Sequence, residues 1–216
     1  MFKIKLPISY TSAMRVKICG ITRPEDALAS EAAGADALGL NFASFSKRFV
    51  TVEQAEAIVA PLGPFISLVG VFVDAPLDFV LETAQHLKLS AVQLHGHEDA
   101  HYALEVSAHV PVIKAVSFKV GLEPEAFADF PATALMLDGL SPGSGAAFSW
   151  TEATAWAGLP HLILAGGLTP ETVAAGIRAL RPYTVDVASG VEASPGIKDE
   201  TKLHDFVRAA KAASDL

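Results

Sequence analysis

The chain has 216 residues, of which 51% are apolar and 19% charged, and its formal net charge is −8. These values predict a folded protein with a substantial core, and they argue against disorder and against nucleic acid or an anionic membrane as a partner. The single cysteine excludes an intramolecular disulfide framework and agrees with a reducing, cytoplasmic setting, and no apolar run reaches the roughly 18 residues of a membrane span.

Residues 1–13 carry two lysines but neither a long apolar stretch nor a convincing cleavage site, so they do not predict a signal peptide. Met14 directly precedes the first organised strand. We interpret residues 1–13 as an N-terminal extension, either disordered or an artefact of start-site choice. Residues 14–216 are then expected to form a single domain, since no linker-like change of composition interrupts them.

Short β-branched or apolar runs recur along this domain, and successive runs start 21 to 30 residues apart. They begin near Arg15, Asp36, Ile66, Ser90, Pro111, Thr133, His161 and Thr184. Alanine-rich segments of helical periodicity lie between or after them, at 26–33, 52–60, 77–87, 98–106, 171–180 and 201–212. For the segment 171–180, Thr169 is expected to be the N-cap, with Pro170 at the first helical position.

Eight strands alternating with about as many helices predict parallel pairing, right-handed crossovers and a closed (β/α)8 TIM barrel. A doubly wound sheet is the alternative. It usually has fewer strands, and it would need an unusual arrangement to hold eight such regular units.

Active sites of (β/α)8 barrels lie at the C-terminal ends of the strands, and two reactive side chains occupy such ends here. Cys19 ends the run 15–19, and Asp138 closes the apolar run 134–137. A lone cysteine is often only a small buried hydrophobe, and a strand-end carboxylate is often a helix cap. Their positions nevertheless make Cys19 a candidate thiol of the active site. Asp138 is a candidate acid or base whose pKa partial burial would raise.

The last two strand ends carry glycine-rich turns that predict a phosphate site. Gly166 and Gly167 precede the helix expected at 171–180, and Ser189 and Gly190 follow the final strand. Exposed N–H groups and a helix dipole suit a phosphate, which barrels commonly bind after strands seven and eight. The alternative is that these glycines only form tight turns.

Arg48 lies beside Lys47 in a loop, where solvation is the default, but its planar guanidinium also suits bidentate binding of a carboxylate. His95, His97 and His101 do not have the spacing of a metal site with cysteine or carboxylate ligands, so we expect no metal.

Lys17 and Asp186 belong to the first and last strands, which are neighbours in a closed barrel. We hypothesise that both side chains point inward and pair below the site. The pair is either purely structural or a means by which Lys17 lowers the pKa of Cys19.

Five ordered blocks of the sequence resemble phosphoribosylanthranilate isomerase. They span residues 16–22, 34–42, 92–96, 164–170 and 185–199, and the similarity runs from about residue 15 to the C-terminus. The resemblance implies a barrel of the ribulose-phosphate-binding type that works without a cofactor in tryptophan biosynthesis. The implied reaction is an Amadori rearrangement of N-(5-phosphoribosyl)anthranilate to 1-(2-carboxyphenylamino)-1-deoxyribulose 5-phosphate.

The resemblance also implies roles for individual residues. Asp138 would be the general acid and Cys19, as thiolate, the general base. Arg48 would bind the anthranilate carboxylate, and Gln93 would be a further substrate contact. The backbone around Gly166, Gly167, Ser189 and Gly190 would bind the phosphate. The expected partner is therefore a small phosphosugar–anthranilate substrate, and the expected assembly is a monomer or homodimer.

The segment 141–150 departs from the family pattern, since Ser144 replaces a threonine, and Ala146 and Ala147 stand where a polar or charged residue is common. Two other readings remain open. One is a different phosphosugar barrel, either synthase-like with a lysine acid or epimerase-like with carboxylates and a metal. The other is a phosphate-ligand binding or regulatory module without catalysis.

Overall fold

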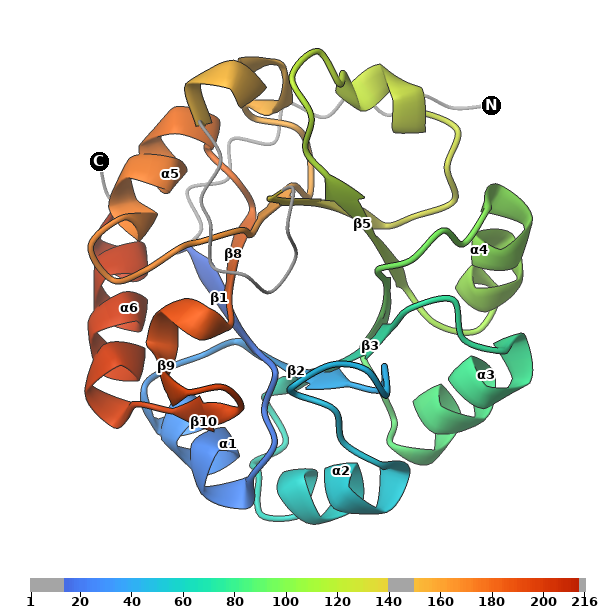
Figure 1. Cartoon of the computed structure of the whole chain (residues 1–216), viewed down its shortest axis with the longest axis vertical. Coiled ribbons are helices and arrows are strands. Elements are labelled where there is room, and N and C mark those ends of the chain that lie inside the picture. The colour runs from blue at the N-terminus through green and yellow to red at the C-terminus, as the bar shows by residue number, and fades with distance from the viewer. Residues whose placement is uncertain (1–13, 140–149, 214–216) are drawn as a thin grey trace.

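The computed structural model describes residues 14–139 and 150–213, which form a closed barrel of eight parallel strands (Figure 1). The strands are β1 (Arg15–Cys19), β2 (Ala37–Asn41), β3 (Ser67–Phe72), β4 (Ala91–Leu94), β5 (Val112–Ser117), β6 (Ala134–Asp138), β7 (Ile163–Leu164) and β8 (Thr184–Val187). Each strand pairs with its sequence neighbours, and β8 pairs with β1. The predicted (β/α)8 barrel is confirmed. The predictions for residues 1–13 and 141–149 lie outside the described residues.

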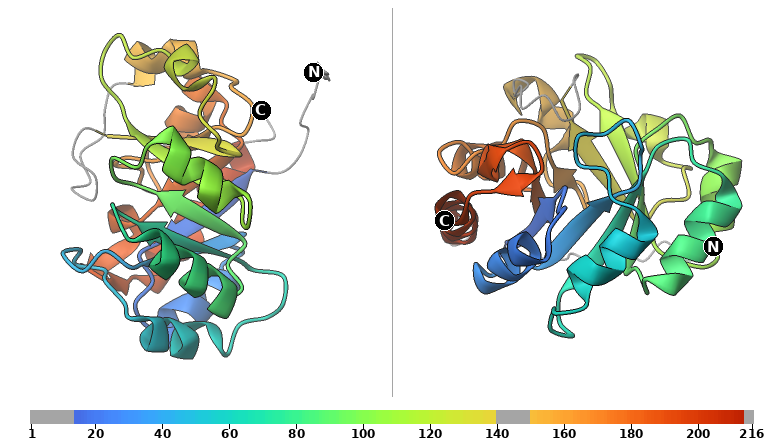
Figure 2. Two further views of the ribbon diagram at one scale, coloured as in Figure 1. Left: turned by 90° about the vertical axis from the view of Figure 1, so that its right-hand side faces the viewer. Right: turned by 60° about the horizontal axis from the view of Figure 1, so that its bottom comes forward.

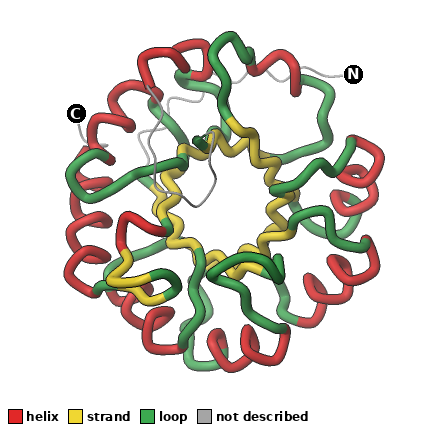
Figure 3. The backbone as a smooth tube through the Cα atoms, viewed as in Figure 1, coloured by secondary structure: helices red, strands yellow, loops and turns green. Residues whose placement is uncertain are grey.

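Helices surround the ring of strands (Figure 3), and Figure 2 shows the same arrangement from two further sides. They are α1 (Pro24–Ala32), α2 (Val52–Val59), α3 (Leu77–His86), α4 (Ala100–Ser107), α5 (Val173–Leu180) and α6 (Glu200–Ala213). Three short 3-10 helices are η1 (Pro124–Phe127), η2 (Trp150–Trp156) and η3 (Ser189–Val191). A small hairpin of β9 (Glu192–Ser194) and β10 (Ile197–Lys198) follows η3 and has no counterpart in the sequence prediction.

The six segments predicted to be helical correspond to α1 through α6, and 3-10 helices follow β5 and β6 in the described chain. The predicted N-cap Thr169 is wrong, since α5 begins at Val173 with Thr172 as its N-cap residue. The carbonyl of Thr169 accepts hydrogen bonds from the N–H groups of Thr172 and Val173, so Thr169 and Pro170 form a turn ahead of the helix.

Apolar side chains fill two regions, one between the strands and the helices and a smaller one inside the barrel. The inner cluster consists of Val69, Ile113, Ala115, Met136, Ile163 and Ala165. Toward β1 and β8, by contrast, the interior holds charged groups. The charged side chains therefore lie directly below the strand ends at which barrel active sites lie.

Lys17 and Asp186 form that charged part of the interior, as the hypothesis of inward-pointing side chains requires. They are register partners on β1 and β8, and the Lys17 Nζ lies 2.7 Å from Asp186 Oδ1. Nζ also donates to Gln93 Oε1 at 3.0 Å. Burial alone would lower the pKa of Lys17, but the charge of Asp186 outweighs it and raises that pKa above its ordinary value. Lys17 is therefore a permanent buried cation.

Replacement of Lys17 by methionine is expected to lower the free energy of unfolding by about 3–5 kcal/mol, because it leaves the buried Asp186 carboxylate without its counter-charge. Urea unfolding followed by far-UV circular dichroism measures the change. The double variant Lys17→Met/Asp186→Asn removes both charges and should recover most of the loss. A double variant as unstable as the single one would show that the loss does not arise from the unpaired charge.

Candidate active site

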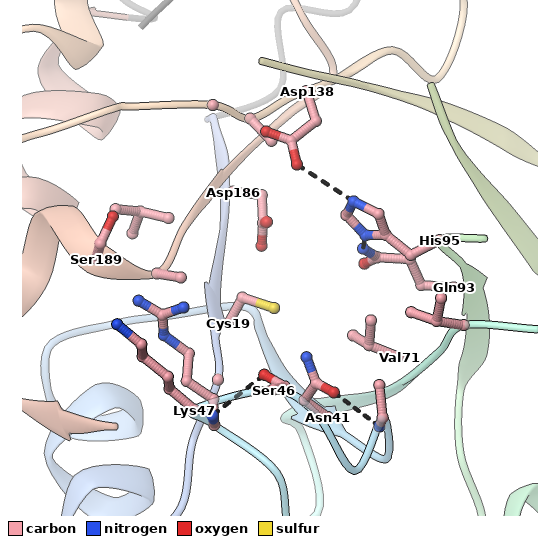
Figure 4. Close-up of a pocket in the computed structure, with 18 of the residues that line it drawn as sticks. Cys19, Asn41, Ser46, Lys47, Val71, Gln93, His95, Asp138, Asp186 and Ser189 are labelled. Carbon is pink, nitrogen blue, oxygen red and sulfur yellow. Dashed lines mark hydrogen bonds and ion pairs between the residues drawn. The ribbon is translucent and has the colours of Figure 1, made fainter. Parts of the chain in front are cut away.

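A cavity of about 340 Å³ opens at the C-terminal ends of the strands (Figure 4). The predicted site residues that line it are Cys19, Arg48, Gln93, Asp138, Gly166, Gly167 and Ser189. Gly190 follows Ser189 in η3 and packs against the Leu168 carbonyl. The closed barrel thus brings together residues that are as much as 170 positions apart in sequence (19 to 189).

Cys19 ends β1 with its thiol directed into the cavity (Figure 4). Gly39 of β2 makes room for it, since a Cβ there would lie 2.7 Å from the sulfur. Burial raises the pKa of Cys19, Lys17 and Lys198 oppose that rise, and Asp186 adds to it. The hypothesised effect of Lys17 is therefore present in direction, but burial outweighs it. Cys19 is accordingly a weak acid whose thiolate is a strong base.

Asp138 closes β6 and is 8% exposed. Its Oδ1 accepts a hydrogen bond of 2.8 Å from the N–H of Gly139, and its Oδ2 lies 3.3 Å from Nε2 of His95 (Figure 4). One carboxylate oxygen thus accepts from a backbone N–H, and the other lies near a ring nitrogen that can carry a proton. Such donors stabilise the carboxylate that remains after Asp138 gives up a proton.

Arg48 is held by a partner that the sequence analysis missed. Its Nε donates to Glu192 Oε1 at 2.7 Å and its Nη2 to Glu192 Oε2 at 2.8 Å. Lys198 Nζ donates to the same carboxylate at 3.1 Å and to the Cys19 carbonyl at 2.7 Å. Burial would raise the pKa of Glu192, but the two cations lower it below its usual value. The β9–β10 hairpin therefore ties the arginine loop to the end of β1.

The glycine turn after β7 has a backbone conformation that favours glycine. Gly166 and Gly167 have φ values of 78° and 71°, in the left-handed region. A Cβ on Gly166 would lie 3.0 Å from Asp138 Oδ1 and 2.5 Å from the Gly139 nitrogen. Glycine at 166 thus lets the β7 turn approach the acid closely. The phosphate-binding role of the two turns stays a prediction.

The structure gives His95, His97 and Gln93 neighbours that the sequence analysis did not predict. His95 was considered only as a metal ligand, yet it lies beside Asp138, whereas His97 lies beside Asp74. Gln93 lines the cavity, but both ends of its amide already contact Lys17 and His95. Gln93 and His95 are two residues apart at the end of one strand. That spacing predicts a shared face, and it was the signal available in the sequence.

Within the described ranges, no helix is long and apolar enough to cross a membrane. In the same residues, no three histidine, cysteine, aspartate or glutamate side chains gather as they would around a metal ion.

Comparison with known proteins assigns the chain to a family. A family model described as N-(5'-phosphoribosyl)anthranilate (PRA) isomerase matches residues 16–209. The chain belongs to the PRA isomerase family. It is 45% identical over 202 residues to N-(5'-phosphoribosyl)anthranilate isomerase of Pelobacter propionicus. The aligned region covers 92% of this chain and 96% of the relative. The resemblance found in the sequence is thereby confirmed.

Solved structures of PRA isomerases have the same fold. The enzyme of Thermus thermophilus superposes with a TM-score of 0.85 at 48% identity, over 91% of this chain and 98% of that one. A second PRA isomerase structure is in complex with reduced 1-(o-carboxyphenylamino)-1-deoxyribulose 5-phosphate. It superposes with a TM-score of 0.84 at 40% identity, over 92% of this chain and 99% of that one.

Two charge-removing variants should move the pKa of Cys19 in opposite directions. Asp186→Asn is expected to lower it, since a nearby negative charge is lost, and Lys198→Met is expected to raise it, since a nearby positive charge is lost. The rate of iodoacetamide alkylation as a function of pH measures both shifts, because Cys19 is the single cysteine of the chain. Asp205→Asn on α6 is the matched control. Unchanged alkylation midpoints in both test variants would refute this electrostatic account.

Proposed function

We propose that this PRA isomerase family member catalyses the Amadori rearrangement of N-(5-phosphoribosyl)anthranilate to 1-(2-carboxyphenylamino)-1-deoxyribulose 5-phosphate in tryptophan biosynthesis. One observation carries the proposal: an acid, Asp138, and a base, Cys19, line the same cavity at the end of the barrel. A family member that binds a reduced form of the proposed product gives further support.

Asp138 acts as the general acid in the first step. It donates a proton to the ribose ring oxygen, and the bond between that oxygen and C1 breaks. The lone pair of the anthranilate nitrogen forms the C1–N double bond of a Schiff base, and the ring oxygen becomes a hydroxyl group. The N–H groups around Asp138 favour this step, because they stabilise the carboxylate that it leaves behind.

Cys19 acts as the general base in the second step. Its thiolate removes the proton from C2, and the electron pair of that C–H bond moves through C1 to the nitrogen, giving an enolamine. The enolamine then gains a proton at C1 and loses the proton of the C2 hydroxyl group, which leaves the ketone. The raised pKa of Cys19 makes its thiolate a strong base, although it lowers the fraction of thiolate at neutral pH.

In this proposal, Arg48 in the loop after β2 and the glycine turns after β7 and β8 bind the substrate. Glu192 occupies the edge of the Arg48 guanidinium formed by Nε and Nη2, so the edge formed by the two terminal nitrogens remains for the anthranilate carboxylate. Backbone N–H groups of residues 166, 167, 189 and 190 bind the phosphate. Gln93 lines the same cavity and is a further contact for the substrate. The chemistry requires no cofactor, since it consists of proton transfers.

The other candidate functions have less support. A synthase-like barrel needs a lysine acid, but the Lys114 ammonium at β5 donates to Glu98 and to the Gly96 carbonyl. A regulatory module without catalysis would not need both an acid and a base in its binding cavity. We further propose that residues 14–216 act as one cytoplasmic catalytic domain, as a monomer or a homodimer.

Removal of either proton-transfer group should lower kcat by about 10²–10⁴-fold. The variants are Cys19→Ala and Asp138→Asn, and the fluorescence of the anthranilate moiety follows turnover. Asp78→Asn, an acidic residue of α3, is the matched control and should keep normal activity. If the wild type does not turn over the substrate, the proposed function fails. If it does, and Cys19→Ala is unimpaired, only the assignment of the base fails.

Arg48→Gln tests the carboxylate site. With the natural substrate, kcat/KM is expected to fall about 10- to 100-fold, as loss of a hydrogen bond to a charged group implies. With the aniline analogue that lacks the carboxylate, wild type and variant should have similar kcat/KM values. Glu192 keeps Lys198 as its ion-pair partner in the variant. An equal loss with both substrates would place the role of Arg48 elsewhere.

A further inference from the structure

A line of buried and partly buried polar contacts joins the cation of β1 to the proposed acid of β6. Lys17 Nζ donates to Gln93 Oε1 at 3.0 Å, and Gln93 Nε2 lies 2.8 Å from His95 Nδ1. His95 Nε2 in turn lies 3.3 Å from Asp138 Oδ2. Figure 4 shows Gln93 and His95 on the same side of the cavity, with the ring of His95 directed at Asp138.

Elementary hydrogen-bond chemistry fixes the orientation of the first link. A lysine ammonium group only donates hydrogen bonds, so the Gln93 atom that faces Lys17 must be the carbonyl oxygen. The reversed amide would place two N–H groups against a buried cation. Lys17 and Gln93 are 2% and 1% exposed, so water is not available to relieve that clash. The amide nitrogen of Gln93 is therefore the atom that faces His95.

The second link fixes the tautomer of the histidine. Because Gln93 Nε2 donates, His95 Nδ1 must accept, and a neutral imidazole then carries its proton on Nε2. Nε2 is buried and lies 3.3 Å from Asp138 Oδ2, and it makes no hydrogen bond of ordinary geometry with the described residues. Catalytic hydrogen bonds that are long or poorly aligned in a substrate-free enzyme tighten in the complex with substrate.

We propose that Lys17, acting through Gln93, holds His95 as the Nε2–H tautomer, and that His95 is a positioning residue for Asp138. The proposal rests on the proposed role of Asp138 as general acid. When Asp138 gives its proton to the ribose ring oxygen, negative charge develops on the carboxylate. A hydrogen bond donated by His95 Nε2 to that carboxylate stabilises the charge as it develops, which lowers the barrier of that step.

The same cation acts on both reacting groups in this scheme. Lys17 lies beside Cys19 and opposes the rise of its pKa. Through Gln93, Lys17 also determines that His95 presents an N–H donor to Asp138. In this account, Gln93 has a positioning role in addition to any contact with substrate.

The tautomer is measured directly by 15N NMR of the substrate-free protein labelled at histidine. The chain has seven histidines, and the spectrum of His95→Gln assigns the resonances of His95 by their loss. In the wild type, Nδ1 should resonate as an unprotonated and Nε2 as a protonated nitrogen. A protonated Nδ1 in the wild type would overturn the proposal.

Two variants test whether Lys17 and Gln93 cause this state. In Gln93→Glu, a carboxylate accepts from both neighbours, so Nδ1 of His95 should gain a proton. In Lys17→Met/Asp186→Asn, the amide of Gln93 is free to reverse, and the Nδ1 resonance should move in the same direction. The second variant keeps the test available if the first does not fold. Unchanged His95 resonances in every variant that folds would overturn the role of Lys17 and Gln93.

The contribution to catalysis is tested with a matched pair of amide variants. The side-chain nitrogen of His95→Gln can reach the position of Nε2, whereas that of His95→Asn reaches only the position of Nδ1. We expect kcat to fall about tenfold in His95→Asn, to be largely retained in His95→Gln, and KM to be unchanged in both. Equal losses of kcat would overturn the positioning role. The NMR result does not depend on turnover, so it stands even if the proposed function fails.

Discussion

The ion pair of Lys17 and Asp186 is the constraint on which the rest of the site depends. An isolated charge inside the barrel would cost several kcal/mol, so each of the two groups is tolerated only beside the other. They are register partners on β1 and β8, the two strands that close the barrel. Any slip of β8 against β1 would separate them. The pair therefore links closure of the barrel to the presence of a fixed positive charge directly below Cys19.

The buried charges also explain how an acidic chain can accept an acidic substrate. The net charge of −8 repels anions over most of the surface. At the cavity, Glu192 is shared by Arg48 and Lys198, which leaves that group of three with a net positive charge. The Lys198 ammonium lies between the carbonyl of Cys19, beside the base, and the carbonyl of Ala188, directly before the turn of Ser189 and Gly190. The cavity is therefore locally positive although the chain as a whole is acidic.

The chemistry of Cys19 reflects a balance between burial and charge. Burial raises the pKa of Cys19 and makes its thiolate a stronger base. The positive charges of Lys17 and Lys198 limit that rise of the pKa. Gly39 gives both the sulfur and the Lys17 ammonium the space that they need. A larger residue on β2 would displace the thiol from the cavity.

The sequence predicted the parts of this site that depend on local pattern. All eight strands were found because apolar runs alternate with helical segments, and Cys19 and Asp138 were found because they end such runs. The inward pair of Lys17 and Asp186 followed once closure made its strands neighbours. The partnership of Arg48 with Glu192 did not follow, since 144 residues separate them and a small hairpin positions one of them. The contact of His95 with Asp138 did not follow either, because the two residues lie at the ends of different strands.

The central claim is that the thiolate of Cys19 removes the C2 proton of the substrate. The most direct test measures kcat/KM of the wild-type protein against pH, with substrate carrying either hydrogen or deuterium at C2 of the ribose. A thiol with a raised pKa predicts that kcat/KM rises with pH along the alkylation curve of Cys19, and that deuterium slows the reaction. A value of kcat/KM that does not vary with pH over that range, with no isotope effect at any pH, would contradict the account.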